Sequence, residues 1–115
     1  MRFKTALILV PALLLAAGCT STPTGRSISI EMTNFKLDPT QVEVKAGETV
    51  QLVLNNKSDT EHEFESDAGK FEEILVPAGK SRTVSWTAPN KAGSYEFECD
   101  MAGHDGMVMT VQVSN

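Results

Sequence analysis

The segment SYEFECDMAGHDGMVMTVQV, residues 94–113, decides the fold class. Apolar residues stand at every second position on both sides of its centre: Tyr95, Phe97 and Cys99 before it, and Met107, Met109, Val111 and Val113 after it. A period of two is typical of a strand with one buried face. The centre carries two glycines and breaks the alternation. The segment therefore predicts two strands joined by a loop.

The same alternation recurs through the chain from residue 27 onward. It is carried by Ile28, Ile30 and Met32, by Val42 and Val44, by Val50, Leu52 and Leu54, and by Val84 and Trp86. Proline, glycine and asparagine separate these runs, and residues of these types form turns. No segment shows a sustained helical period. The pattern predicts an all-β sandwich or barrel of seven to eight short strands.

The first eighteen residues have the composition of a signal peptide. Arg2 and Lys4 precede an apolar run that contains no charge, and the run ends in LAAGC, residues 15–19. This ending resembles a bacterial lipoprotein cleavage site, which implies cleavage before Cys19 and lipidation of its sulfur. The alternative is an ordinary secretory signal followed by a chance cysteine. We expect a signal peptide at 1–18, a lipidated cysteine and flexible tether at 19–26, and one domain at 27–115.

Lipidation would hold the protein at the bacterial cell envelope, on the periplasmic face of a membrane or at the cell surface. Thr20 stands where aspartate would be the usual signal for retention at the inner membrane, so the outer membrane is favoured. The part after residue 18 has eight basic and fifteen acidic residues, a formal net charge of −7. This charge argues against nucleic acid as a partner.

The loop after Cys99 places three metal-binding side chains close together in the sequence, as Cys99-x4-His104-x2-Met107. If Cys19 carries lipid, Cys99 has no partner for a disulfide, and metal ligation would protect its thiolate in an oxidising compartment. His62 is the only other histidine of the chain. Two histidines and a cysteine with a weak axial methionine form the blue-copper ligand set.

Each of these residues has a simpler interpretation. His62 could be a solvated loop residue, Cys99 an inert core thiol, and Met107 a core side chain like Met109. Zinc is a competing metal, although methionine is a poor zinc ligand. Acidic residues also alternate with His62 and Phe64: Asp59, Glu61, Glu63, Glu65 and Asp67. In a strand they would point away from a metal and form either a solvated face or an acidic docking patch.

The ordered set of motifs resembles the cupredoxins, the family of azurin, plastocyanin and amicyanin. The likeness covers nearly all of residues 28–113 and is carried by NF at 34–35, Pro39, VKAGETV at 44–50, HEF at 62–64, PAGK at 77–80, AGSYxFxC at 92–99 and GH at 103–104. It implies a Greek-key fold and one type 1 copper per chain, with His62, Cys99 and His104 as equatorial ligands. Met107 rather than Met109 would be the axial ligand, and His104 would be the electron port. Glu63 differs from azurin and plastocyanin, which have asparagine there.

The resemblance implies a one-electron carrier with no enzymatic turnover. Its expected partner is a redox protein such as a cytochrome or a membrane oxidoreductase, and we expect a monomer. An alternative is a copper or iron handling protein that uses the same site for tolerance, delivery or uptake. A metal-free adhesive or structural β-domain is the third possibility, since a fold alone does not define a function.

Overall fold

The computed structural model describes residue 18 and residues 25–115, so most of the predicted signal peptide, Cys19 and most of the tether lie outside the described residues. The described part contains nine strands: β1 (Ser27–Thr33), β2 (Lys36–Asp38), β3 (Gln41–Lys45), β4 (Thr49–Asn56), β5 (His62–Ser66), β6 (Phe71–Val76), β7 (Ser81–Thr87), β8 (Gly93–Glu98) and β9 (Val108–Ser114). The all-β prediction is confirmed, but the predicted number of strands is too low. The three-residue strand β2 buries only Leu37 and is too short to show alternation. No helix within these residues is long and apolar enough to cross a membrane.

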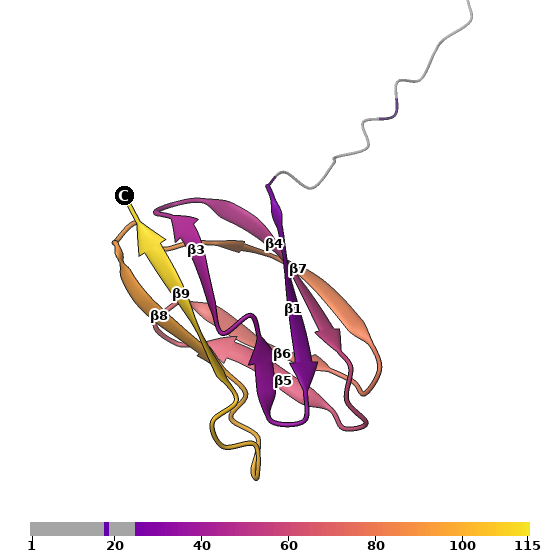
Figure 1. The fold of residues 1–115 in the computed structure, drawn as a ribbon. Helices are drawn as coiled ribbons and strands as arrows, with labels where there is room; N and C mark the ends of the chain where they lie inside the picture. Colours follow the sequence, from indigo (N-terminus) through magenta and orange to yellow (C-terminus); the bar gives the residue numbers. More distant parts are fainter. Residues whose placement is uncertain (1–17, 19–24) are drawn as a thin grey trace, which may run out of the picture.

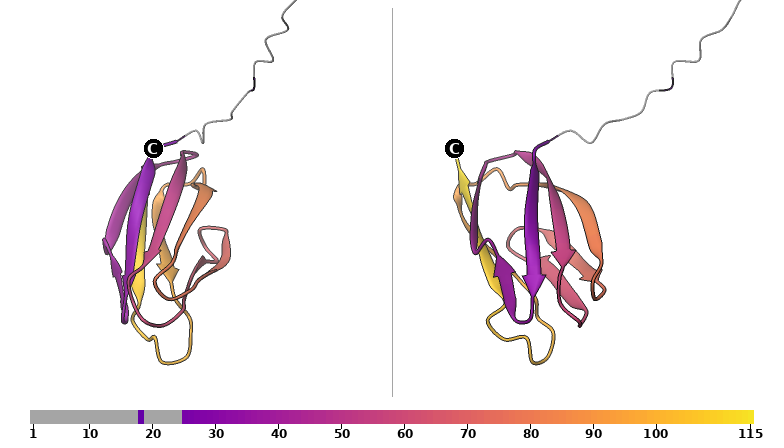
Figure 2. Two further views of the ribbon diagram at one scale, coloured as in Figure 1. Left: turned by 90° about the vertical axis from the view of Figure 1, so that its right-hand side faces the viewer. Right: turned by 45° about the vertical axis from the view of Figure 1, so that its right-hand side comes forward.

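The strands form two sheets that pack face to face (Figure 1, Figure 2). One sheet has the order β2-β1-β4-β7 and the other β3-β9-β8-β5-β6. β1 pairs with β4 and β3 with β9 in parallel, while the other strand pairs are antiparallel. β8 and β9 are central in their sheet, so both ends of the loop between them are held on neighbouring strands.

The predicted inward residues form the core between the sheets. Ile30, Met32, Leu52, Leu54 and Met109 are at most 1% exposed. An aromatic cluster of Phe64, Phe71, Trp86 and Phe97 fills the space around β5 and β8. The ring of Phe97 stacks on Phe64 at 5.1 Å and meets the edge of Trp86 at 5.2 Å between centroids. Two of these rings lie two residues from a predicted metal ligand, Phe64 after His62 and Phe97 before Cys99, so the core supports the strands that carry the ligands.

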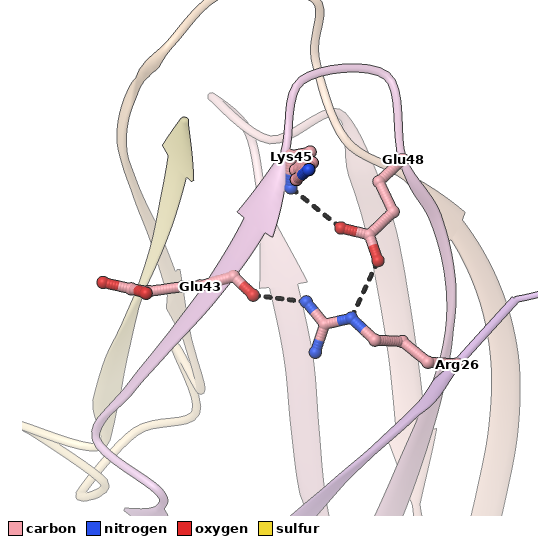
Figure 3. Close-up of polar contacts among 4 residues, drawn as sticks. All are labelled: Arg26, Glu43, Lys45 and Glu48. Carbon is pink, nitrogen blue, oxygen red and sulfur yellow. Dashed lines mark hydrogen bonds and ion pairs between the residues drawn. The ribbon is translucent and has the colours of Figure 1, made fainter. Parts of the chain in front are cut away.

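The end of the sandwich where β1 begins lies opposite the loop between β8 and β9 (Figure 1). Figure 3 shows that Arg26, just before β1, reaches across this end. Its Nε donates to Glu48 Oε1 at 2.7 Å, and its Nη2 donates to the carbonyl of Glu43. Glu48 Oε2 also accepts from the backbone N–H of Lys45 at 2.8 Å. The start of the domain is thus tied to the turn between β3 and β4, and we call this group the tether-end clamp (Arg26, Glu43, Lys45, Glu48).

Candidate metal centre

The three predicted equatorial ligands come from three places in the chain. His62 is the first residue of β5, Cys99 follows the last residue of β8, and His104 lies in the loop before β9. Backbone hydrogen bonds fold that loop back on itself, from Cys99 N–H to the Met107 carbonyl at 3.0 Å and from Met107 N–H to the His104 carbonyl at 3.2 Å. This folding brings His104 over Cys99 and next to His62.

The donor atoms of these three side chains converge. The Nδ1 atoms of His62 and His104 are 3.1 Å apart, and Cys99 Sγ lies 3.4 Å from His104 Nδ1 and 4.0 Å from His62 Nδ1. A circle through three points with these separations has a radius of about 2.1 Å, close to the bond lengths of roughly 2.0–2.3 Å that histidine and cysteine make to zinc. A single metal ion therefore fits within the triangle without rearrangement of its ligands. Among the described residues this is the single group of three or more histidine, cysteine or acidic residues close enough to hold a metal.

Both candidate axial methionines are buried. Both belong to the core cluster, but Met107 is bonded through its backbone to Cys99 and His104, whereas Met109 lies within β9. Because the carbonyl and N–H of Met107 close the ligand loop, its backbone is held beside the donor triangle. This position favours Met107, as the sequence predicts.

The two histidines have different surroundings. His62 is fully buried, and burial lowers the pKa of its imidazole, with repulsion from His104 as a further cause. A lowered pKa keeps His62 neutral, so that one ring nitrogen can bind a metal. His104 is half-buried, and the ring of Phe35 meets it edge-on at 5.3 Å between centroids. Phe35 itself is 55% exposed. One ligand is thus inside the protein and the other lies near its surface.

The carboxylates around β5 point away from the donor triangle, as the alternation predicts. His62, Phe64 and Ser66 are buried, while Glu63 and Glu65 are half-buried on the other face of the strand. Partial burial raises the pKa of Glu65, and nearby carboxylates, Glu63 first among them, raise it further. No described carboxylate belongs to the donor group.

Sequence reasoning missed the residues that contact the other ring nitrogen of His62, Nε2. Ser58 Oγ lies 2.8 Å from His62 Nε2, and Ser58 is in turn bonded to the buried amide of Asn56. These two residues belong to a turn of ordinary composition and are part of no recognisable motif. The only sequence signal is the spacing of four residues between Ser58 and His62, together with Glu63 in place of the asparagine of azurin and plastocyanin.

The chemistry of the donor set fits copper better than zinc. Two imidazoles and one thiolate in a triangle, with a thioether beside them, are the ligands of a type 1 copper site. Structural zinc sites use four strong donors from cysteine, histidine or carboxylate, and the described residues here supply three. Cys99 is buried and forms no disulfide within the described residues, so its sulfur is available.

Comparisons with known proteins agree with this geometry. The sequence model of the family described as Cupredoxin-like domain matches residues 6–111. The copper-resistant cuproprotein CopI of Rubrivivax gelatinosus is 32% identical, over 76% of this chain and 66% of that protein, so the chain spans slightly under two thirds of that relative. Among solved structures, dithionite-reduced auracyanin from Roseiflexus castenholzii superimposes with a TM-score of 0.68 at 20% identity, over 77% of this chain and 97% of that one. Auracyanin A, a blue copper protein from Chloroflexus aurantiacus, gives a TM-score of 0.63 at 22% identity, over 76% and 99% of the two chains.

Proposed function

Because this chain belongs to the cupredoxin-like family, we propose that it binds one copper ion through His62, Cys99, His104 and Met107 and carries single electrons. The observation that carries this proposal is the preassembled triangle of two Nδ1 atoms and one Sγ, whose size suits one metal ion. Bound copper would supply the chemistry, a one-electron change between Cu(I) and Cu(II). The protein holds the ligands and excludes water, and no enzymatic turnover is proposed.

The half-buried His104 is the proposed point at which the electron enters and leaves. His62 and Cys99 are buried, so neither can touch a partner. The ring of His104 lies next to Phe35, which has the largest exposed fraction among the exposed large apolar side chains that the structure describes. An apolar contact beside a ligand ring allows a partner to approach closely without displacing charged groups.

Lipidation of Cys19 and attachment to the bacterial cell envelope, with the outer membrane favoured, belong to the same proposal. The sequence LAAGC supports them. The partner would be a redox protein such as a cytochrome or a membrane oxidoreductase, acting on a monomer. The acidic residues on the outer face of β5 support a basic partner, because opposite charges accelerate encounter.

Copper handling is the second candidate, since the relative from R. gelatinosus is named a copper-resistant cuproprotein. In that case the same ligands would bind copper for tolerance or delivery without a redox partner. A carrier is expected to retain copper and to exchange electrons quickly and reversibly. A handling protein is expected to give up Cu(I) to an acceptor.

The visible spectrum of the purified protein after addition of Cu(II) tests the site. We expect an intense thiolate charge-transfer band that disappears in Cys99→Ser. Met107→Leu should shift this band, whereas the matched change Met109→Leu should leave it in place. A colourless protein that ignores copper would refute both candidate functions.

Voltammetry and metal competition separate the two candidates. Reversible voltammetry, rapid reduction by a cytochrome and retention of Cu(I) against a chelator support the electron carrier. Slow electron exchange with rapid loss of Cu(I) to the chelator supports copper handling.

A further inference from the structure

The side chain of Asn56 has a fixed orientation. It is 1% exposed at the end of β4, and its Nδ2 donates to the carbonyls of Thr60 at 2.7 Å and Val76 at 2.8 Å. Its Oδ1 faces the backbone N–H of Ser58 at 2.9 Å. The opposite orientation would set an NH2 group against an N–H and a carboxamide oxygen against two carbonyls. Backbone groups therefore decide which end of this amide faces Ser58.

The orientation of Asn56 determines where the proton of the Ser58 hydroxyl lies. Ser58 Oγ is 2.7 Å from Asn56 Oδ1 and 2.9 Å from the carbonyl oxygen of Thr60. Both atoms can only accept hydrogen bonds, so the single hydroxyl proton must point to one of them. The lone pairs of Oγ then face the two remaining neighbours, the backbone N–H of Thr60, which donates to it at 3.4 Å, and His62 Nε2 at 2.8 Å. A hydroxyl whose proton is already used can only accept there, so Nε2 must carry the proton.

We propose that Asn56 and Ser58 are positioning residues that hold His62 as the Nε2–H tautomer, with the lone pair of Nδ1 directed at the metal. Neutral imidazole has one protonated nitrogen, so a proton on Nε2 leaves Nδ1 as the acceptor. Nδ1 is the atom that lies 3.1 Å from His104 Nδ1 and 4.0 Å from Cys99 Sγ. The tautomer of His62 is thus fixed before metal binds, by hydrogen bonds that begin at the backbone carbonyls of Thr60 and Val76.

Azurin and plastocyanin have asparagine after the first histidine, where this chain has Glu63. Glu63, which follows His62 here, lies half-buried on the opposite face of β5, and the partner of His62 Nε2 is Ser58 Oγ. Partners of the non-binding nitrogen fix ring orientation and raise the affinity of a histidine for metal. The inference rests on the proposed copper site, but its first test needs no metal.

The first test is the tautomer of His62 in the metal-free protein. Long-range proton–nitrogen correlation spectra of the full chain labelled with nitrogen-15 distinguish the two ring nitrogens, and we expect the Nε2–H form at pH 8. A proton on Nδ1 of His62 would overturn the proposal.

The second test is the metal affinity of Ser58→Ala, measured with Cu(I) and Cu(II) by competition against chelators. We expect affinity to fall about 10- to 100-fold and the single tautomer of His62 to become a mixture. Ser58→Thr keeps the hydroxyl and should restore both properties. Ser81→Ala is the matched control, because Ser81 Oγ donates to Asn55 Oδ1 at 2.8 Å in an exposed pair that does not touch either histidine.

The outcomes separate this inference from the proposed function. If Ser58→Ala retains the tautomer and the affinity of the unchanged protein, the positioning role is refuted even though copper binds. If the unchanged protein shows the Nε2–H form and yet binds no copper, the hydrogen-bond assignment is supported and the copper function is refuted. Equal losses in Ser58→Ala and Ser81→Ala would indicate a general effect on stability and would also refute the positioning role.

Discussion

The two ends of the sandwich are held by opposite kinds of interaction. At the metal end, the uncharged groups of the buried Asn56 and His62 and of the half-buried Ser58 form a hydrogen-bonded chain. At the other end, the tether-end clamp joins Arg26 and Glu48 through an ion pair whose side chains are 51% and 26% exposed. Buried hydrogen bonds are directional and costly to break, whereas exposed ion pairs contribute little and weaken with salt. Directional hydrogen bonds thus lie beside the candidate metal ligands, and a more tolerant ion pair lies where the domain begins.

The largest predicted effect comes from the core that supports the metal end. Phe97 is fully buried against Phe64, Phe71 and Trp86. Phe97→Ala should lower the free energy of unfolding by about 3–5 kcal/mol, because it removes apolar contacts and leaves a cavity. Urea unfolding of the metal-free protein measures this loss. Val108→Ala, at a position 38% exposed on the paired strand, is the control. Equal losses in the two variants would contradict the assignment of Phe97 to the supporting core.

The next largest effect is expected at the buried hydrogen bonds of the metal end. Asn56→Ala removes the Oδ1 atom that accepts from Ser58 and the Nδ2 group that donates to the carbonyls of Thr60 and Val76. We expect the free energy of unfolding to fall by about 2–3 kcal/mol, since buried polar groups lose their hydrogen bonds. Asn55→Ala is the matched change at the adjacent position, where the amide bonds to exposed Ser29 and Ser81. A smaller loss of unfolding free energy in Asn56→Ala than in Asn55→Ala would contradict the stronger role given to the buried hydrogen bonds.

A third prediction concerns a charge at the metal end. Asp100 is exposed and directly follows Cys99. Its carboxylate should favour Cu(II), so Asp100→Asn should raise the reduction potential by the equivalent of about 1 kcal/mol or less, because water screens the charge. Voltammetry at low and high salt measures the shift, which should shrink as salt is added. An unchanged midpoint potential would show that Asp100 does not influence the reduction potential.

The smallest effect is expected at the tether end. The hydrogen bond from Arg26 and that from the Lys45 backbone lower the pKa of Glu48. A lowered carboxyl pKa stabilises the fold above the unfolded value of about 4.3, and this contribution disappears as the pH falls through the folded value. Glu48→Gln should therefore cost about 0.2–1 kcal/mol at pH 7 and nothing at low pH, as measured by urea unfolding. A loss as large as that of Asn56→Ala would show that the clamp is more than an exposed ion pair.

Much of the fold was predictable because one-sided burial leaves a period of two in the sequence. The alternations at β1, β4 and β9 identified these strands directly, and the ligand spacing joined His62 to Cys99 and His104. β2 and β6 were not identified, since the first is too short and Glu72, Glu73, Ile74 and Leu75 in the second do not alternate. The roles of Asn56 and Ser58 could not be predicted, because they depend on carbonyls that only the folded chain brings together.

The place of Arg26 bears on how the domain would face a membrane. From Cys19 to Arg26 the chain spans seven residues, which reach about 25 Å at most when fully extended. Arg26 directly precedes β1, which begins at the end of the sandwich opposite the loop between β8 and β9 (Figure 1). If Cys19 carries the lipid that we propose, a bilayer would lie at the end of the domain where β1 begins. His104 would then face away from the membrane. Such an orientation favours a diffusing cytochrome over an oxidoreductase embedded in the same membrane.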